Sequence, residues 1–191
     1  SNKFFKDPEV KTGSASDIDY KGSGYDRGHL APAGDMSYSE ETMLESFYYS
    51  NMSPQTPGLN RGRWADLEDA MRATCVTKNS PLFIVTGGVL KPDLPKLEQG
   101  INQVSIPNHY YKVILDLEHS EAIGFIMPNS KCEYPLKHYV CSVDSIEKVT
   151  GLNFFEKLPD DAEKTIESIV HSEYWLPDGK KTGDVEPLDA T

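Results

Sequence analysis

Hydrophobic periodicity predicts two helices in the first half of the chain. Apolar residues recur at helical spacing over residues 38–49. A second set recurs at steps of three, four and four: Trp64, Leu67, Met71 and Cys75. This second set forms one apolar stripe, so we predict a helix over residues 60–75 with one buried face. Prolines and glycine at 54, 57 and 58 indicate a loop between the two helices.

The second half of the chain has the character of β-strands. Runs rich in β-branched and aromatic residues predict strands over residues 82–86, 110–117, 122–127 and 139–143, with a turn at 118–121. Short helices are predicted over 145–150, ended by Gly151, and over 161–171. Strands and helices in this order argue for a mixed α+β fold.

Length and composition fit one domain. The chain has 191 residues, of which 38% are hydrophobic and 26% charged, and it contains no repeat and no low-complexity linker. We predict a single domain over residues 1–175 and a C-terminal loop or tail over 176–191. No apolar run approaches the ~20 residues of a membrane-spanning helix, so we expect no membrane partner.

The charge balance restricts how this protein could bind a polyanion. Nineteen Lys+Arg against thirty Asp+Glu leave a net charge of −11, which excludes a broad cationic surface. All four arginines nevertheless fall between residues 27 and 72: Arg27, Arg61, Arg63 and Arg72. Guanidinium groups bind phosphate oxygens in bidentate fashion. The competing interpretation is salt bridging to acidic residues of the predicted helix, namely Asp66, Glu68 and Asp69.

Three cysteines are too few for a disulfide scaffold. A bridge between Cys132 and Cys141 and three buried thiols both remain open.

The most specific signal is a set of motifs with fixed spacing. The chain reads Tyr-Asp-Arg-Gly-His-Leu-Ala-Pro at 25–32, Asn-Met-Ser-Pro-Gln at 51–55 and Leu-Asn-Arg-Gly-Arg-Trp at 59–64. His29 is followed by Asn60 after 31 residues, by Glu68 after eight more and by Arg72 after another four. This pattern closely resembles the DNA/RNA non-specific endonuclease family, and looser similarity continues over most of the chain.

The resemblance implies the ββα-metal (His-Me finger) nuclease fold, with a central, mostly antiparallel sheet flanked by helices. It implies an endonuclease that hydrolyses phosphodiester bonds in DNA and RNA with little sequence preference, using Mg²⁺, or Mn²⁺ or another divalent cation in its place. The family pattern also includes strands upstream of this motif, and some members supply a further arginine there. Only 25 residues precede Asp26, so we expect these N-terminal strands to be missing and a sheet edge to be exposed.

The residues of the motif make chemical sense for this reaction. Hydrolysis of a phosphodiester needs an activated water and a cation that neutralises developing charge. An imidazole has an ordinary pKa of roughly 6.5, so neutral His29 is our candidate general base. By resemblance, Asn60 is the metal ligand through its amide oxygen. A single direct protein ligand is compatible with Mg²⁺, which keeps several of its waters.

Two further catalytic residues follow on the predicted helix. Helical spacing puts Glu68 and Arg72 along one border of the apolar stripe. The resemblance implies that Glu68 holds waters around the metal, and that Arg72 contacts phosphate or the metal-site network. An i,i+4 ion pair between Glu68 and Arg72 is the competing interpretation, and both can hold together.

The remaining candidates are expected to bind or orient. Arg27 shares a face with His29 in an extended segment, and the resemblance implies that it binds the phosphoryl group. Substrate-binding or orienting roles are expected for Asp26, Asn51, Gln55, Arg61 and Arg63. For Asn51 and Gln55, hydrogen bonds that stabilise a loop are an equal alternative.

The cellular context is the weakest part of the sequence record. Bacterial relatives are often exported, so we expect a secreted or periplasmic protein whose partners are DNA and RNA substrates. A homodimer is left open. The competing functions are a nucleic-acid- or partner-binding module that has lost activity on the same scaffold, and a phosphodiesterase acting on small nucleotides.

Overall fold

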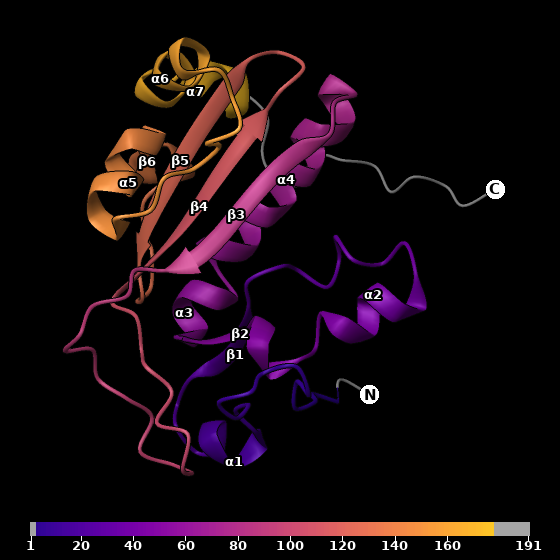
Figure 1. Cartoon of the computed structure of the whole chain (residues 1–191), viewed down its shortest axis with the longest axis vertical. Helices are drawn as coiled ribbons and strands as arrows, with labels where there is room; N and C mark the ends of the chain where they lie inside the picture. Colours follow the sequence, from indigo (N-terminus) through magenta and orange to yellow (C-terminus); the bar gives the residue numbers. More distant parts are fainter. Residues whose placement is uncertain (1–2, 178–191) are drawn as a thin grey trace.

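The computed structural model describes residues 3–177 (Figure 1). Its elements are α1 (Asp17–Tyr20), β1 (Asp26–His29), α2 (Glu40–Glu45), η1 (Tyr49–Asn51), β2 (Met52–Gln55), α3 (Pro57–Asn60), α4 (Arg63–Lys78), β3 (Leu82–Gly88), β4 (His109–Asp116), β5 (Glu121–Pro128), η2 (Leu136–Tyr139), β6 (Val140–Cys141), α5 (Val143–Thr150), α6 (Asp160–Ser168) and α7 (Ser172–Trp175). Most of the C-terminal tail predicted from residue 176 lies outside the described residues.

An antiparallel sheet lies at the centre of three layers. Its strand order is β3-β4-β5-β6, with β3 at one edge. Helix α4 covers one face of the sheet, and α5 and α6 cover the other (Figure 1). Phe83 on the edge strand β3 is 52% exposed, in agreement with the expectation of an exposed sheet edge. The predicted α+β fold with a mostly antiparallel sheet is confirmed.

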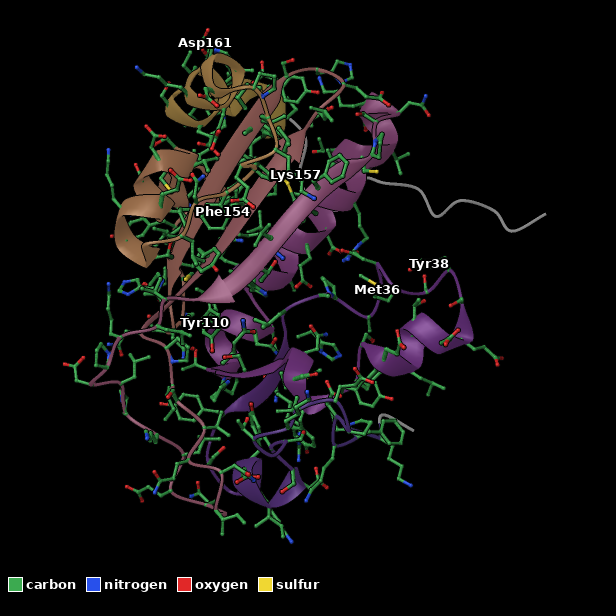
Figure 2. The ribbon with its side chains drawn as sticks, viewed as in Figure 1. Met36, Tyr38, Tyr110, Phe154, Lys157 and Asp161 are labelled. Carbon is green, nitrogen blue, oxygen red and sulfur yellow. The ribbon has the colours of Figure 1, made fainter. Side chains whose placement is uncertain are left out.

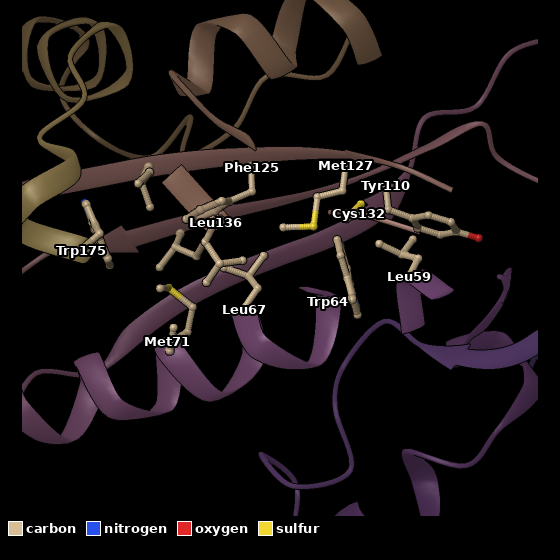
Figure 3. Packing of buried hydrophobic residues seen from close by; sticks show 13 residues of the cluster. Leu59, Trp64, Leu67, Met71, Tyr110, Phe125, Met127, Cys132, Leu136 and Trp175 are labelled. Carbon is tan, nitrogen blue, oxygen red and sulfur yellow. The ribbon is translucent and has the colours of Figure 1, made fainter. Parts of the chain in front are cut away.

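Strand alternation divides the core between the two faces. Even-numbered residues of β4 such as Tyr110 and Ile114 pack toward α4, whereas Val113 and Leu115 pack toward α5. The α4 side forms the larger cluster, which includes Ala70 and in which Trp64, Leu67 and Met71 of α4 point up against the sheet (Figure 3). This packing fixes the rotation of α4 about its axis, and hence the direction of its polar edge.

A separate two-stranded ribbon holds the motif residues. Strand β1 pairs antiparallel with β2, and α3 lies between this ribbon and the start of α4 (Figure 1). The Tyr110 hydroxyl is 2.7 Å from the Ser53 hydroxyl and donates to the carbonyl of Pro54 at 2.9 Å. The Asn129 side chain accepts from the backbone N–H of Thr56 and donates to Pro54. Tyr110 lies where the sheet meets α3 and the ribbon (Figure 2), so these bonds join the two units.

The helix predicted over 60–75 is displaced and divided. Asn60 ends the short helix α3 instead of opening the long one, and α4 begins only at Arg63. The break is at Gly62, whose φ of −114° and ψ of −123° are not helical. A Cβ at this position would lie 2.6 Å from the Gly58 carbonyl, so glycine is required there. At the other end α4 continues to Lys78 and is closed by left-handed Asn79.

Two other predicted elements are shorter than expected. The helix predicted over 38–49 forms only as α2, which buries no residue and leaves Leu44 57% exposed. The strand predicted over 139–143 is reduced to the two residues of β6, because Ser142 caps α5. The strands predicted at 82–86, 110–117 and 122–127 are confirmed, as is the helix ended by Gly151. All three cysteines are free thiols, so the Cys132–Cys141 bridge is absent.

Candidate active site

His29 is the last residue of β1, and aromatic rings enclose one side of it. The Phe47 ring meets it edge-on, with centroids 5.0 Å apart, and the Phe4 centroid lies at 6.1 Å. Its Nε2 is buried without a hydrogen-bond partner among residues 3–177, while Nδ1 makes no hydrogen bond and is not enclosed. Burial lowers the pKa of His29 below 6.5. The imidazole is therefore neutral near pH 7 and presents Nδ1 outward.

Gly28 and Gln55 support His29 from the interior. Gln55 is fully buried, and its side chain packs across the ribbon onto Gly28. A Cβ on Gly28 would lie 2.2 Å from Oε1 of Gln55, so only glycine allows this approach. Because Gln55 is enclosed, its contact is with the strand that bears His29, which fits the orienting role expected for it.

Asp26 fixes the orientation of Asn60. Its carboxylate accepts a hydrogen bond from Asn60 Nδ2 at 3.0 Å, and it also accepts from Arg61 Nε at 2.8 Å and Nη2 at 2.5 Å. A carboxylate can only accept, so the amide nitrogen must face Asp26. The Asn60 Oδ1 atom has no hydrogen-bond partner among the described residues and is the atom left for a cation. The side chain of Arg61 is 71% exposed around this contact.

Glu68 is a half-buried carboxylate with no hydrogen-bond partner in the part of the chain that the structure describes. Burial raises its pKa to about 7, against the lowering effect of Lys112 and Arg72. Its oxygens are not enclosed. A carboxylate in this state gains from a nearby cation or from water held by one.

Lys112 is a buried cation that the sequence interpretation missed. It lies on the α4 face of β4, 1% exposed, with Nζ 5.0 Å from the Trp64 ring centroid. Nζ donates to Thr86 Oγ1 at 2.8 Å, and burial lowers the pKa of Lys112 to about 8. The signal was present, because Lys112 stands at an inward position in an otherwise apolar strand.

Arg72 joins α4 to the loop that follows His29. Nη1 donates to Asp35 at 2.6 Å and Nη2 to Asp69 at 2.5 Å. The competing interpretation of an ion pair between Glu68 and Arg72 is therefore wrong, since Asp69 at i−3 and Asp35 hold the guanidinium. Arg72 affects Glu68 only by Coulomb attraction, which lowers the pKa of Glu68.

Arg27 lies on the same side of the ribbon as His29. Its guanidinium is 4.9 Å from the centroid of the Phe4 ring, which also approaches His29. Nε donates to the Tyr49 hydroxyl at 3.0 Å and Nη2 donates to Asp17 at 2.5 Å. A surface pocket opens here, lined by Lys3, Phe4, Lys6, Ser16, Asp17, Arg27 and Tyr49. Two lysines and an arginine outnumber Asp17 here, so the lining of this pocket is net cationic.

The other two candidates have structural contacts. Asn51 accepts from the N–H of Ala31 and donates to the carbonyls of Ala31 and Ser46, each at 2.9 Å, which fastens the loop after His29. Arg63 donates to Asp66 at 2.5 Å and to the carbonyl of Tyr134 at 2.9 Å. Salt bridging within the helix thus accounts for Arg63 and for one of the two partners of Arg72, whereas Arg27 and Arg61 pair outside it.

A single core anchors these side chains. Leu30, next to His29, and Leu59, next to Asn60, pack into the same hydrophobic cluster as Trp64 of α4. The bond between Asp35 and Arg72 closes the loop after His29 onto α4. Because each functional residue adjoins an anchored one, His29, Asn60, Glu68 and Arg72 belong to one unit made of the ribbon, α3 and α4. An imidazole nitrogen, an amide oxygen and a carboxylate near arginines suit hydrolysis of a phosphodiester.

Comparison with known proteins finds similarity to nucleases. Residues 1–161 match the family described as DNA/RNA non-specific endonuclease. The chain is 39% identical over 173 residues to nuclease C1 of Cunninghamella echinulata var. echinulata, covering 82% of this chain and 68% of that protein. It is 36% identical over 157 residues to mitochondrial endonuclease G of Bos taurus, covering 73% and 51%.

Two further matches extend the comparison. Mitochondrial nuclease EXOG of Xenopus laevis is 39% identical over 178 residues, covering 83% of this chain and 49% of that protein. A crystal structure of the EndoG/EndoGI complex superposes with a TM-score of 0.65 and 31% identity, over 76% of this chain and 64% of that chain. The chain thus spans about half the length of the endonuclease G and EXOG proteins that it matches.

These relatives correct one expectation. Endonuclease G of Bos taurus and EXOG of Xenopus laevis are mitochondrial proteins, which contradicts the expectation of a secreted or periplasmic location. The bacterial relatives behind that expectation were the wrong guide. Within residues 3–177, no helix combines the length and the apolar character that crossing a bilayer requires.

Proposed function

Because this chain belongs to the DNA/RNA non-specific endonuclease family, we propose that it hydrolyses phosphodiester bonds within DNA and RNA, with Mg²⁺ as cofactor and His29 as general base. The observation that supports the proposal most strongly is the orientation of Asn60, whose amide nitrogen is engaged by Asp26 and whose Oδ1 is left free. We assign the nuclease domain to residues 1–175, in keeping with the family match over 1–161.

The residues present fit a hard divalent cation. Asn60 would bind it directly through Oδ1, and Glu68 would accept hydrogen bonds from its hydration waters. The free Oδ1 of Asn60 and the partnerless carboxylate of Glu68 are the two observations behind this assignment. When bound, Mg²⁺ would neutralise the negative charge that develops on the phosphate oxygens.

His29 performs the proton transfer. Its Nδ1 accepts a proton from the attacking water while Nε2 keeps its own, so the ring becomes an imidazolium. The water oxygen bonds to phosphorus as the bond from phosphorus to the 3′-oxygen breaks, and the departing oxygen takes a proton from a water molecule. The lowered pKa of His29 favours the neutral form that this step needs. The packing of Phe47 and Phe4 limits the ring to one orientation, so less freedom is lost on the way to the transition state.

Arginine side chains neutralise the phosphate. Arg72 faces the loop after His29, and Arg27 lies beside the pocket lined by Lys3 and Lys6. Each now pairs with a carboxylate at the surface, Asp35 and Asp17, so phosphate binding would exchange one anion for another. Arg27 is the more direct candidate, because it shares the ring of Phe4 with His29.

Plasmid cleavage tests the proposal. Wild-type protein should nick supercoiled DNA and degrade RNA with Mg²⁺ and should do neither in EDTA. Asn60→Ala should lower the rate at 1 mM Mg²⁺ about 10- to 100-fold or more, with partial recovery at higher Mg²⁺, because removing a ligand weakens cation binding. Asn153→Ala, an exposed asparagine after α5, is the matched control and should cleave like wild type.

Four results would contradict the proposal. Cleavage that persists in EDTA would show that the reaction needs no cation. An unchanged Mg²⁺ dependence in Asn60→Ala would show that Asn60 is not a ligand of the cation. Binding of nucleic acid without any cleavage would instead favour a binding module. Equal hydrolysis of dinucleotides and polymers would favour a phosphodiesterase of small nucleotides.

A further inference from the structure

A second group of acidic side chains lies on the opposite face of the sheet from the candidate active site. Asp144 and Glu147 are on α5, and Glu167 is on α6. One carboxylate oxygen from each lies within 4.8 Å of the others. Both helices cover the face of the sheet that α4 does not (Figure 1). This acidic group is thus independent of the nuclease proposal.

Packing forces the three carboxylates together. Val143 and Ile146 of α5 and Ile166 of α6 belong to one hydrophobic cluster, so the two helices cannot separate without exposing it. Asp144 and Glu147 are three residues apart and share a face of α5. Glu167 follows Ile166 directly and is carried to that face with it.

Glu167 lacks the interactions that a buried carboxylate requires. It is only 4% exposed, and its Oε1 is enclosed without any hydrogen-bond partner among residues 3–177. The side chains of Glu167 and Asp144 make no hydrogen bond to any described residue, and the Glu147 side chain accepts only one, from the N–H of Phe154 at 2.8 Å. An enclosed carboxylate oxygen without a donor is costly to keep.

The electrostatic surroundings make this cost larger. The charged groups that act on Glu167 are all acidic: Glu147, Glu163 and Asp144. Burial, followed by these anions, raises the pKa of Glu167 to about 7. Glu167 also lies in the last turn of α6, where the helix dipole disfavours an anion and no basic residue stands. Only a proton or a cation can relieve this arrangement.

The geometry favours a cation over a proton alone. We propose that Asp144, Glu147 and Glu167 bind a Ca²⁺ ion that fastens α5 to α6. Ca²⁺ takes six to eight oxygens at about 2.3–2.6 Å, so opposite ligands can lie about 5 Å apart, which accommodates the three carboxylates as they stand. Mg²⁺ demands shorter contacts and is usually held by only one or two carboxylates.

The surroundings of the group allow the remaining ligands. Asp144 and Glu147 are only partly buried, so water can complete the coordination from the open side. Glu167 lies beyond residue 161, where the match to the endonuclease family ends. The site is therefore a structural clasp of this chain and takes no part in the proposed hydrolysis.

Thermal unfolding with and without Ca²⁺ tests the proposal. Chelator-treated protein is compared with protein in 5 mM CaCl₂ at pH 7.5, with bound Ca²⁺ counted by equilibrium dialysis. All variants are made both in wild type and in the Asn60→Ala background, which removes Ca²⁺ binding at the proposed nuclease site. Failure of the nuclease proposal would leave these readouts unaffected.

Glu167→Gln and Glu163→Gln form a matched pair one turn apart on α6. Ca²⁺ should raise the Tm of wild type and Glu163→Gln by about 5 °C or more when it exceeds its Kd about 100-fold. In Glu167→Gln, Ca²⁺ should raise the Tm by less than about 1 °C, and the variant should bind one Ca²⁺ ion fewer than wild type. Asp144→Asn should behave like Glu167→Gln. Without Ca²⁺, Glu167→Gln should have a higher Tm than wild type, because it removes the repulsion between the carboxylates.

Two outcomes would overturn the clasp. An equal Ca²⁺ shift in Glu167→Gln and wild type would locate the ion elsewhere. No Ca²⁺ shift in wild type at 5 mM would mean that Glu167 is relieved by a proton, and its group is then a shared-proton cluster. If Mg²⁺ binds to wild type and this binding is lost in Glu167→Gln, the three carboxylates are still the site, but its ion is Mg²⁺ and the assignment of Ca²⁺ is wrong.

Discussion

The imidazole of His29, the proposed general base, is held by the rings around it and by no hydrogen-bond partner among residues 3–177. Phe47 and Phe4 pack against its ring, Nε2 is enclosed, and Nδ1 is left open. Enclosing Nε2 without an acceptor costs about 1–3 kcal/mol, a cost that the folded chain tolerates at this position. Such a cost is commonly found where a side chain serves function more than stability.

The pH dependence of cleavage should report this environment. Because burial lowers the pKa of His29, the neutral form should persist to below pH 6.5. The rate at saturating Mg²⁺ should therefore rise with pH and level off at an apparent pKa below 6.5. The measurement is kcat for a short oligonucleotide between pH 4.5 and 8. A plateau reached only well above pH 7 would contradict His29 as the base in this environment.

Gly28 provides a second test at the residue scale. Gly28→Ala would drive Cβ to 2.2 Å from Oε1 of the buried Gln55, and overpacking of this kind costs about 1–3 kcal/mol. We expect a lower free energy of unfolding together with slower cleavage, because β1 bears His29. Urea denaturation measures the first. The double variant Gly28→Ala/Gln55→Ala should recover part of the loss, and a purely additive double variant would show that the clash is not the cause.

Sequence patterns predicted which candidate residues lie in one unit better than they predicted the contacts of each residue. His29, Asn60, Glu68 and Arg72 belong to one anchored unit, as their spacing suggested. The carboxylates that hold Arg27 and Arg61, namely Asp17 and Asp26, come from other segments. Such pairings depend on tertiary contacts over many residues, which no local pattern contains. Lys112 was missed because it belongs to no motif with fixed spacing. What makes it unusual is that its neighbours in the strand are apolar.

At the scale of elements, the site depends on how the ribbon is fastened to the sheet. Tyr110 reaches from β4 to Ser53 and Pro54 of β2, and its ring packs edge-on against Trp64 of α4. One tyrosine thus holds β2 against both the sheet and the long helix. The fully buried ring makes this join rigid.

Two neighbouring tyrosines allow a controlled test of that join. Tyr110→Phe removes the bonds to Ser53 and Pro54 and should cost about 1–2 kcal/mol of unfolding free energy. Tyr111→Phe, on the opposite face of β4, removes a hydroxyl that bonds to no described residue and should cost less than about 0.5 kcal/mol. Denaturant melts measure both, and cleavage should slow only in Tyr110→Phe. Equal costs would contradict the anchoring role.

Element boundaries show where local patterns fail. The strands of the sheet lie where they were predicted, because successive side chains of a strand face opposite sides and the sequence pattern follows this alternation. The helix predicted from residue 60 instead starts at Arg63, since Gly62 breaks it with a backbone conformation set by the close approach of Gly58. The apolar residues of the helix predicted over 38–49 include Phe47, which packs against His29 instead of a helical face. Tertiary contacts explain both departures.

At the scale of the whole molecule, an acidic protein must bind a polyanion through a small cationic surface. The net charge is −11, and the pocket beside Arg27 contributes Lys3 and Lys6. Few phosphates can be engaged at once. The proposed enzyme should therefore bind nucleic acid weakly and release it readily.

Salt titration measures the size of this surface. Each phosphate contact contributes a slope of about −0.9 to log affinity against log salt, so two to four contacts predict a loss of roughly 10- to 100-fold between 50 and 200 mM. Lys6→Ala should reduce the slope by about 1, whereas Lys157→Ala, on the loop before α6, should not change it. A slope near −8 would indicate a broad cationic face and contradict this account.

Chemical rescue of His29→Ala tests the central claim most directly. The variant should keep its fold by circular dichroism while its single-turnover cleavage rate with Mg²⁺ falls by about 10²- to 10⁴-fold, the usual contribution of a general base. Added imidazole should restore part of that rate in proportion to its neutral form, because the cavity left between Phe4 and Phe47 opens onto the place of Nδ1. Cleavage by folded His29→Ala at the wild-type rate would contradict the account.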